Sequence, residues 1–403
     1  MEHVIIAGAG QAGAGAALKL RELGFAGRIT LLGAETVPPY ERPELSKGYA
    51  QGTVPFEKLV VLTPVAARAA DIDLRLGTCV DGLDRDAQTL RAGDETLSYT
   101  HLVLATGGRA RRLTPPEGWR APLLSIRDVS DADALATELT RASAGRRRAV
   151  ILGGGWLGLE AAATCRAAGF EVHVAETAER LCARVAPRWL SGRLAAMHGD
   201  AGVGLRLGTR PFLEGARGVR LGTDLVEADL VIAAIGMQAN DEVARTAGLD
   251  CDDGVLVDAQ GRTADPSVFA IGDCARYRHR GNMRRESWQN ANQSAAAVAH
   301  LILGQEPPVD EPDWFWSTQF GHTIQMLGAC DDAFAQVERE EPSGGGVTRF
   351  FLDQGCLRGV IAIDAKRTLG MARRFVASGA AMEAADLANP GTALKDCITR
   401  PAA

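Results

Sequence analysis

Two glycine-rich segments constrain the fold of this chain more than any other feature of its sequence. Residues 8–13 follow an apolar stretch at 4–7 and precede an alanine- and leucine-rich stretch at 14–23. The pattern recurs about 145 residues later, where residues 153–158 follow an apolar stretch at 148–152. Strand, glycine turn and helix in this order indicate a dinucleotide-binding module. The residues expected to approach the two dinucleotides there are Gly8, Gly10, Gly13, Gly153, Gly155, Leu157 and Gly158.

Glycine suits these turns for physical reasons, and each module continues to an acidic residue. The first glycine permits a tight turn, the second lets the backbone approach a pyrophosphate, and the third lets the helix pack on the strand. Glu35 and Glu176 come shortly after the predicted second strands, 28–32 and 171–175, where a carboxylate accepts hydrogen bonds from a ribose. Because a carboxylate repels a 2′-phosphate, Glu176 favours NADH over NADPH, although Arg184 lies downstream as a counterweight.

Three further apolar segments, at 102–104, 231–235 and 267–271, each lead into a glycine turn. The residues that close these segments form or adjoin the glycine turns. They are Ala105, Thr106, Gly107, Gly236, Gly272 and Asp273.

Composition and charge disfavour several classes of function. The 403 residues carry a net charge of -6 with a pI near 5.7, so no global positive field attracts nucleic acid or an anionic membrane. No apolar run reaches the roughly 18 residues that a membrane span needs. The eight cysteines contain no CxxC pair, which favours a reducing compartment and disfavours disulfides and metal ligation. The chain enters a strand at once, so we expect no signal peptide and a cytoplasmic protein.

Three motifs carry a family resemblance. They are Tyr-Glu-Arg-Pro-Glu-Leu-Ser-Lys at 40–47, Arg-Glu-Ser-Trp-Gln-Asn-Ala at 285–291 and Trp-Phe-Trp-Ser at 314–317. With the Ala-Thr-Gly and Gly-Asp segments, they make the chain resemble the flavoprotein ferredoxin reductases that serve Rieske-type dioxygenases and bacterial cytochromes P450. The resemblance runs from residue 4 to about residue 359. It implies FAD in the first module, NADH in the second, and a 2Fe-2S ferredoxin as the electron acceptor. It also implies that the Ala-Thr-Gly segment at 105–107 and the Gly-Asp segment at 272–273 belong to the FAD site.

The resemblance also implies roles for individual residues. It places Lys47 beside flavin N5, Glu160 near Lys47 and the nicotinamide carboxamide, and Asp273 on the ribityl chain of the flavin. Since hydride passes directly between the cofactors, these side chains are expected to position and tune them. An ordinary ion pair is the alternative for Lys47 and Glu160. A loop or core position is the alternative for the other implied cofactor contacts, which are Arg42, Val80, Arg127, Trp288 and Trp316.

The route of the electrons and the partner are also expected from the sequence. No cysteine occurs from residue 35 to 52, where disulfide reductases of the superfamily carry a redox pair, so electrons are expected to leave the flavin directly. A basic cluster, which either steers an acidic ferredoxin or is a solvated loop, comprises Arg276, Arg278, His279, Arg280, Arg284 and Arg285. The alternatives are a rubredoxin or monodehydroascorbate-type reductase and a flavoprotein resembling apoptosis-inducing factor. Glu44 departs from the flavin-loop motif, in which proline is commoner at that place.

The expected architecture is α/β, with two Rossmann-like dinucleotide-binding domains of the glutathione-reductase type and a C-terminal α+β domain. The FAD domain is expected to be discontinuous, at 1–110 and 246–312, with the NAD domain at 111–245 between its parts. The C-terminal domain is expected at 313–403. Alternating apolar stretches at 323–327, 348–352 and 357–363 predict an antiparallel sheet there, and residues 369–378 predict a helix.

Overall fold

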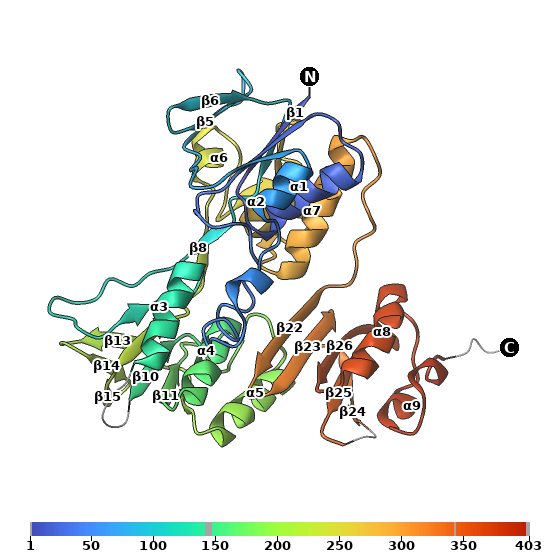
Figure 1. Cartoon of the computed structure of the whole chain (residues 1–403). Coiled ribbons are helices and arrows are strands. Elements are labelled where there is room, and N and C mark those ends of the chain that lie inside the picture. Colours follow the sequence, from blue (N-terminus) through green and yellow to red (C-terminus); the bar gives the residue numbers. More distant parts are fainter. Residues whose placement is uncertain (1, 142–146, 342–343, 400–403) are drawn as a thin grey trace. The chain divides into compact units, whose positions relative to one another are not determined.

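The computed structural model describes residues 2–141, 147–341 and 344–399 (Figure 1). The chain forms two compact units. The first unit comprises Met1–Glu44, Val54–Ala110 and Met237–Asp310, and the second comprises Leu45–Thr53, Arg111–Gly236 and Glu311–Ala403. Each unit therefore contains one of the two glycine-rich segments.

A parallel five-stranded sheet, in the order β19-β7-β1-β2-β3, forms the centre of the first unit. Residues of β1 alternate between its two faces. Val4 and Ile6 belong to a core with helices α1 and α7, whereas Ile5 and Ala7 belong to the core of the opposite face. The elements are β1 (His3–Ala7), β2 (Arg28–Leu32), β3 (Ile72–Arg75), β7 (His101–Leu104), β19 (Val268–Ala270), α1 (Gln11–Glu22) and α7 (Trp288–Ile302).

Smaller elements complete the first unit. One three-stranded sheet consists of β4 (Gly82–Asp84), β5 (Thr89–Ala92) and β6 (Glu95–Ser98). Another consists of β18 (Val255–Val257), β20 (Ala275–Tyr277) and β21 (Met283–Arg284). An antiparallel pair joins β8 (Gly108–Ala110) to β17 (Met237–Ala239). The short helices are α2 (Pro64–Ala69) and α6 (Glu242–Thr246), with 3-10 turns η1 (Phe56–Lys58), η2 (Gly272–Cys274) and η3 (Arg278–Arg280).

The second unit contains a second parallel five-stranded sheet, in the order β12-β11-β10-β16-β9. Its strands are β9 (Leu123–Leu124), β10 (Arg148–Leu152), β11 (Glu171–Ala175), β12 (Gly204–Arg206) and β16 (Leu230–Ala233). The helices are α3 (Val129–Thr140), α4 (Trp156–Ala167) and α5 (Arg188–Asp200). A three-stranded antiparallel sheet consists of β13 (Pro211–Glu214), β14 (Gly218–Leu221) and β15 (Asp224–Glu227).

An antiparallel sheet, in the order β22-β23-β26-β25-β24, completes the second unit. One face packs on α8 through Phe350 and Val360, and the other packs on residues of α4 and α5 through Phe351 and Ile361. The elements are β22 (Trp314–Gln319), β23 (His322–Gly328), β24 (Ala335–Glu340), β25 (Val347–Asp353), β26 (Cys356–Ile363), α8 (Lys366–Ser378), α9 (Ala384–Ala388) and η4 (Leu394–Asp396).

The predicted fold class is confirmed, because both glycine segments join a parallel strand to a helix and the C-terminal sheet is antiparallel. The predicted strands 28–32, 148–152 and 171–175 match the observed bounds. Strands β22 and β24 were not predicted. The division into three domains stays a prediction, since the compact units group the second parallel sheet with the C-terminal sheet.

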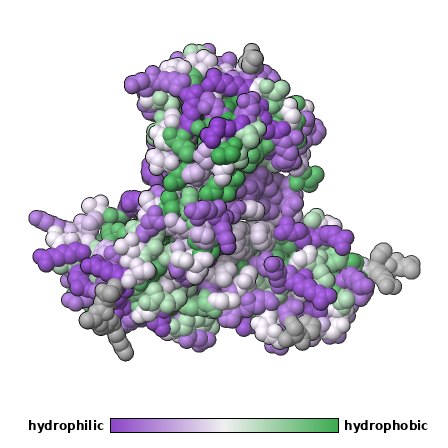
Figure 2. Space-filling view, in the orientation of Figure 1, coloured by the Kyte–Doolittle hydropathy of each residue, from purple (hydrophilic) through white to green (hydrophobic). Residues whose placement is uncertain are grey.

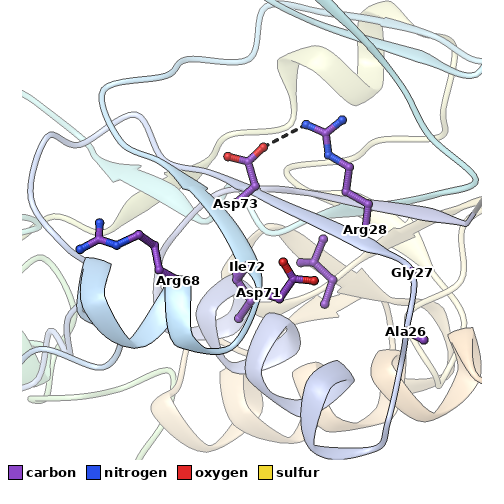
Figure 3. A pocket seen from close by; sticks show the side chains of 8 residues that line it. Ala26, Gly27, Arg28, Arg68, Asp71, Ile72 and Asp73 are labelled. Atoms are coloured by element: carbon purple, nitrogen blue, oxygen red, sulfur yellow. Dashed lines mark hydrogen bonds and ion pairs between the residues drawn. The ribbon is translucent and has the colours of Figure 1, made fainter.

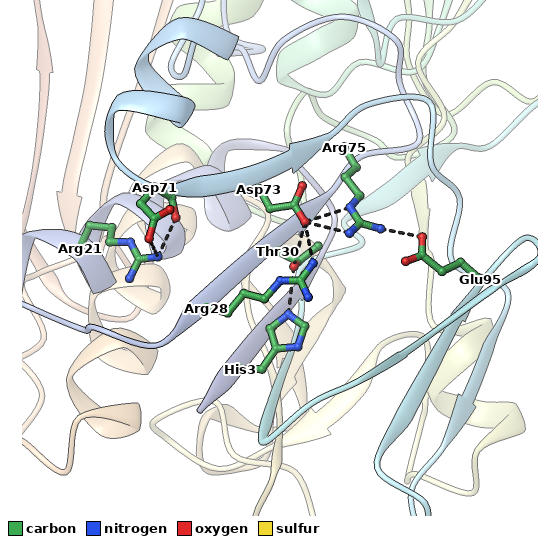
Figure 4. A network of polar contacts seen from close by, with 8 residues as sticks. All are labelled: His3, Arg21, Arg28, Thr30, Asp71, Asp73, Arg75 and Glu95. Atoms are coloured by element: carbon green, nitrogen blue, oxygen red, sulfur yellow. Dashed lines mark hydrogen bonds and ion pairs between the residues drawn. The ribbon is translucent and has the colours of Figure 1, made fainter. Parts of the chain in front are cut away.

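A pocket of about 470 Å³ lies at the amino ends of β2 and β3, where Arg28, Arg68 and Asp71 are among its lining residues (Figure 3). Asp73, which also lines this pocket, accepts hydrogen bonds from Arg28 and Arg75 (Figure 4). The glycine loop follows the carboxyl end of β1, and the strands are parallel, so this pocket lies at the opposite edge of the sheet. It is therefore not part of the dinucleotide site.

Hydrophilic residues cover much of the face seen in Figure 2. The largest exposed apolar side chains, among them Val65, Phe212 and Val309, come from different elements and loops. Within the described residues, no helix combines the length and apolar character that a membrane crossing requires.

Candidate active site

The first glycine loop connects β1 to α1 with little space around two of its glycines. Gly8 has a φ of 119°, and a Cβ there would lie 2.1 Å from the carbonyl oxygen of Ala105. A Cβ on Gly13 would lie 1.9 Å from the carbonyl oxygen of Gly8. A Cβ on Gly10 would meet no atom within 4 Å. The outer glycines thus permit the packing of the turn, while the middle one leaves its surface open to a ligand.

The second glycine loop, between β10 and α4, repeats this geometry. Gly153 has a φ of 109°, and its added Cβ would lie 2.3 Å from the carbonyl oxygen of Ala234. The Cβ of a residue at Gly158 would lie 2.0 Å from the carbonyl oxygen of Gly153, whereas Gly155 is open. Leu157 lies in the first turn of α4, and neither α1 nor α4 has a side-chain cap at its N-terminus. Both loops therefore fit a pyrophosphate at a helix N-terminus.

The carboxyl edge of the first sheet gathers the other predicted residues of the first module. Ala105, Thr106 and Gly107 follow β7, the neighbour of β1, and Gly272 and Asp273 follow β19, the neighbour of β7. The Thr106 hydroxyl donates to the Asn240 carbonyl at 2.6 Å, and the Asn240 amide donates back to Thr106 O at 3.0 Å. Sequence reasoning missed Asn240, because nothing in its local sequence marks this pairing.

Glu35 and Arg42 contact each other at the same edge. One Glu35 oxygen accepts from Arg42 at 2.6 Å and the other accepts from the Tyr40 hydroxyl at 2.6 Å. Burial by itself lowers the pKa of Arg42, but the charges of Tyr40 and Glu35 outweigh this effect and raise the pKa. Glu35, which is predicted to accept hydrogen bonds from a ribose, is thus held by two neighbours. Tyr40 is therefore added to the candidate site.

Two further predicted residues lie in the first unit. Trp288 begins α7, and its indole N–H donates to Glu41 at 2.9 Å. Val80 follows β3 and packs against the core that contains Leu104. Their predicted contacts with FAD stay predictions.

In the second unit, Glu176 is fixed at the carboxyl end of β11. Its carboxylate accepts hydrogen bonds from the backbone N–H of Gly154 at 2.7 Å and of Ala178 at 2.8 Å. Arg184 is exposed farther along the chain. Gly236, with a φ of 93°, follows β16 beside β10. The carboxylate is therefore oriented beside the second glycine loop, where a 2′-phosphate would meet its charge.

Lys47 and Glu160 form a buried ion pair in the second unit. The Lys47 Nζ lies 3.1 Å from Glu160 Oε1, and the exposed fractions of the two residues are 9% and 7%. Glu160 also accepts from the Ser46 hydroxyl and the Ser317 hydroxyl, each at 2.6 Å. Thr164, one turn along α4, donates to the carbonyl of Ser46 at 2.8 Å. Thus every hydrogen-bonding partner of this carboxylate is a donor, as a buried charge requires.

Arg127 and Trp316, predicted to contact FAD and the nicotinamide, also lie in the second unit. Trp316 of β22 stacks on Trp314, with ring centroids 4.8 Å apart. The backbone N–H of Arg127 donates to Asp131 near the start of α3. The structure thus assigns these two residues and the Lys47–Glu160 pair to one unit, and the first glycine loop to the other.

The basic cluster of the first unit is partly neutralised. Arg276 pairs with Asp252 at 3.1 Å, and Arg278 pairs with Asp250 at 2.6 Å. The side chain of Arg284 is 8% exposed and pairs with both Asp253 and Glu286. The side chain of Arg280 lies outside the described part of the structure. These acids were not considered in the sequence-based prediction, and they reduce the positive charge of the loop.

Comparison with known proteins agrees with this geometry. Residues 2–295 match the model of the pyridine nucleotide-disulphide oxidoreductase family, and residues 314–398 match a reductase C-terminal domain. The chain therefore belongs to the pyridine nucleotide-disulphide oxidoreductase family.

Relatives with a ferredoxin reductase name span the whole chain. The ferredoxin–NAD(+) reductase component of the anthranilate 1,2-dioxygenase system of Burkholderia cepacia is 38% identical, over 97% of this chain and 98% of that protein. Putidaredoxin reductase of Pseudomonas putida is 32% identical, over 98% and 97%. The crystal structure of a covalent putidaredoxin reductase–putidaredoxin complex matches with a TM-score of 0.90 and 32% identity, over 98% of each chain.

Proposed function

We propose that this protein is an NADH-dependent FAD ferredoxin reductase that passes electrons singly to a 2Fe-2S ferredoxin. The observation that carries the proposal is the pair of glycine loops with the same geometry, one in each compact unit, which gives one chain two dinucleotide sites. Full-length similarity to ferredoxin reductases supports the choice of acceptor. We also propose a cytoplasmic location, and the three domains at 1–110 with 246–312, 111–245 and 313–403.

FAD and NADH, when bound, would supply the redox chemistry, which is hydride transfer between nicotinamide and flavin and the release of single electrons. The protein binds and orients them. The loops at Gly10 and Gly155 accept the pyrophosphates, and the oriented Glu176 carboxylate selects a free ribose over a 2′-phosphate. Lys47 supplies a positive charge held in place by Glu160.

The remaining predicted contacts complete the proposed cofactor sites. Glu35 and Arg42 would hold the adenosine end of FAD, and Asp273 its ribityl chain. Val80, Arg127, Trp288 and Trp316 would contact FAD or the nicotinamide. Residues 35–52 contain no cysteine, which disfavours a thiol relay between the flavin and the acceptor.

Anaerobic stopped-flow spectroscopy of the FAD-loaded protein tests the proposal. We expect fast loss of flavin absorbance with NADH, much slower loss with NADPH, and fast reoxidation by an oxidised 2Fe-2S ferredoxin. Reoxidation by rubredoxin or monodehydroascorbate, but not by ferredoxin, would assign a different acceptor. No reduction by either nicotinamide would refute the proposal.

A further inference from the structure

A buried line of polar side chains leads away from the Lys47–Glu160 pair within the second unit. Ser317 and Gln319 are fully or almost fully buried on one face of β22, and the exposed Thr318 lies between them on the other face. The Ser317 hydroxyl donates to Glu160 Oε1 at 2.6 Å, and the Gln319 amide donates to the Ser317 hydroxyl at 2.9 Å. Ser317 thus connects Gln319 to the carboxylate.

The line ends at His198 of α5, which has no solvent exposure. Its Nε2 lies 2.8 Å from Gln319 Oε1, and the ring meets Phe320 edge-on. A carbonyl oxygen only accepts hydrogen bonds, so His198 Nε2 carries the proton. His198 Nδ1 is buried and has no hydrogen-bond partner among the described residues, which agrees with a neutral ring. Burial also lowers the pKa of His198.

In every hydrogen bond of this line, the donor is therefore the residue farther from Glu160 and the acceptor is the nearer one. A carboxylate accepts at one end and a neutral imidazole donates at the other, so no member can reverse its bond without losing a partner. Chains of aligned hydrogen bonds polarise one another, which strengthens each bond of the line. His198 comes from α5 and the other two residues come from β22, and the hydrogen bonds that join them end at Glu160.

We propose that His198, Gln319 and Ser317 form a donor chain that orients the Glu160 carboxylate, with Ser317 as the positioning residue for the Lys47–Glu160 pair. The consequence for nicotinamide turnover rests on the function proposed above. The chain itself does not, because it is defined by hydrogen bonds within the protein.

The chain is tested first by NMR of the FAD-loaded, oxidised protein with 15N-labelled histidine rings. Seven histidines give an assignable spectrum, and His198→Gln identifies the His198 signals. We expect a neutral ring protonated at Nε2, whose signal shifts in Ser317→Ala and in Glu160→Gln but not in the control Thr318→Ala. A ring protonated at Nδ1, or a signal unmoved by Ser317→Ala, would overturn the proposal. If Ser317→Ala fails to fold, Gln319→Met breaks the same chain with a similar volume.

The consequence is tested by stopped-flow flavin reduction over a range of NADH concentrations. We expect Ser317→Ala to lower the limiting rate about tenfold, with a smaller change in the NADH dissociation constant, because misplacing a positioned group costs rate more than binding. Ser317→Thr, which keeps the hydroxyl, restores the rate, and Thr318→Ala matches the wild type.

The two proposals fail in different ways. A normal rate in Glu160→Gln would remove Glu160 from the proposed active site, and the NMR comparison would still decide whether the chain exists. If Glu160→Gln lowered the limiting rate of flavin reduction but Ser317→Ala did not, the positioning role of Ser317 would be overturned.

Discussion

Gly155 and Gly158 lie three residues apart, yet they have different surroundings. A Cβ at Gly158 would collide with the backbone of Gly153, while a Cβ at Gly155 would meet nothing within 4 Å. The first position therefore serves the fold and the second is open to a ligand. Gly13 and Gly10 show the same difference in the first module.

This difference predicts opposite effects of two alanine substitutions. Gly158→Ala should lower the free energy of unfolding by about 1–3 kcal/mol or more, because a methyl group is forced into a packed turn. Gly155→Ala should change stability by only about 1 kcal/mol, yet weaken NADH binding at least about tenfold, because the methyl group occupies the ligand face. Urea unfolding and NADH titration check the pair. Equal effects of both substitutions on stability would contradict it.

At the scale of elements, Thr164 attaches the segment Leu45–Thr53 to α4. Its buried hydroxyl donates to the Ser46 carbonyl and accepts from Gln51 at 3.1 Å. Thr164→Val removes both bonds and should destabilise the protein by about 1–3 kcal/mol. Hydrogen exchange in Leu45–Thr53 should rise, while Thr164→Ser should preserve the protection. Unchanged exchange in the valine variant would show that other contacts hold the segment.

Asp73 links β2 and β3 through Arg75 and Arg28 (Figure 4). Burial raises the pKa of Asp73, but the hydrogen bonds from these arginines outweigh it and lower the pKa. A lowered folded pKa contributes stability above the unfolded value near 3.8, and this stability is lost as the pH falls below it.

Asp73→Asn should therefore cost about 1 kcal/mol at pH 7, because exposure screens the pairs, and much less at pH 3. Unfolding by urea at the two pH values measures the difference. The control variant is Arg85→Gln, because Arg85 pairs with Asp265 elsewhere in the first unit. A cost for Asp73→Asn that does not change with pH would exclude the ion pairs as its source.

Much of the fold was predictable because strand and helix patterns are local. The glycine turns and the strand 148–152 follow from apolar runs and their breaks. β24 escaped prediction because its residues are mostly polar or charged and show no clear alternation. The partners of Glu160 could not be read from local patterns, since Ser46 and Ser317 stand 114 and 157 residues away in the sequence.

At the scale of the whole molecule, the charge of the basic cluster depends on acids from the preceding loop. Arg278 keeps a half-exposed side chain beside Asp250. If this face meets an acidic ferredoxin, Arg278→Ala should slow ferredoxin reduction about two- to fivefold at low salt, and the difference should vanish at high salt. Flavin reduction by NADH should stay unchanged.

Arg220→Ala is the matched control, because Arg220 pairs with Glu214 on a separate sheet of the second unit. Stopped-flow mixing with ferredoxin at several ionic strengths measures both variants. If the rate of ferredoxin reduction depended on salt in the same way in both variants, the basic cluster would not be part of the docking face.

The cysteines offer few thiols that can react readily with a modifying reagent. All eight lie among the described residues and are free. Cys79 is exposed, Cys251, Cys330 and Cys356 are partly exposed, and the other four are buried. Burial raises the pKa of Cys165, Cys182 and Cys330 to about 12, so few thiolates form there near neutral pH. Brief treatment with a maleimide should therefore modify Cys79 first, and peptide mass spectrometry would identify the site. An unaltered protein would thus accept a dye or an electrode tether most readily one residue before Val80 in the first unit.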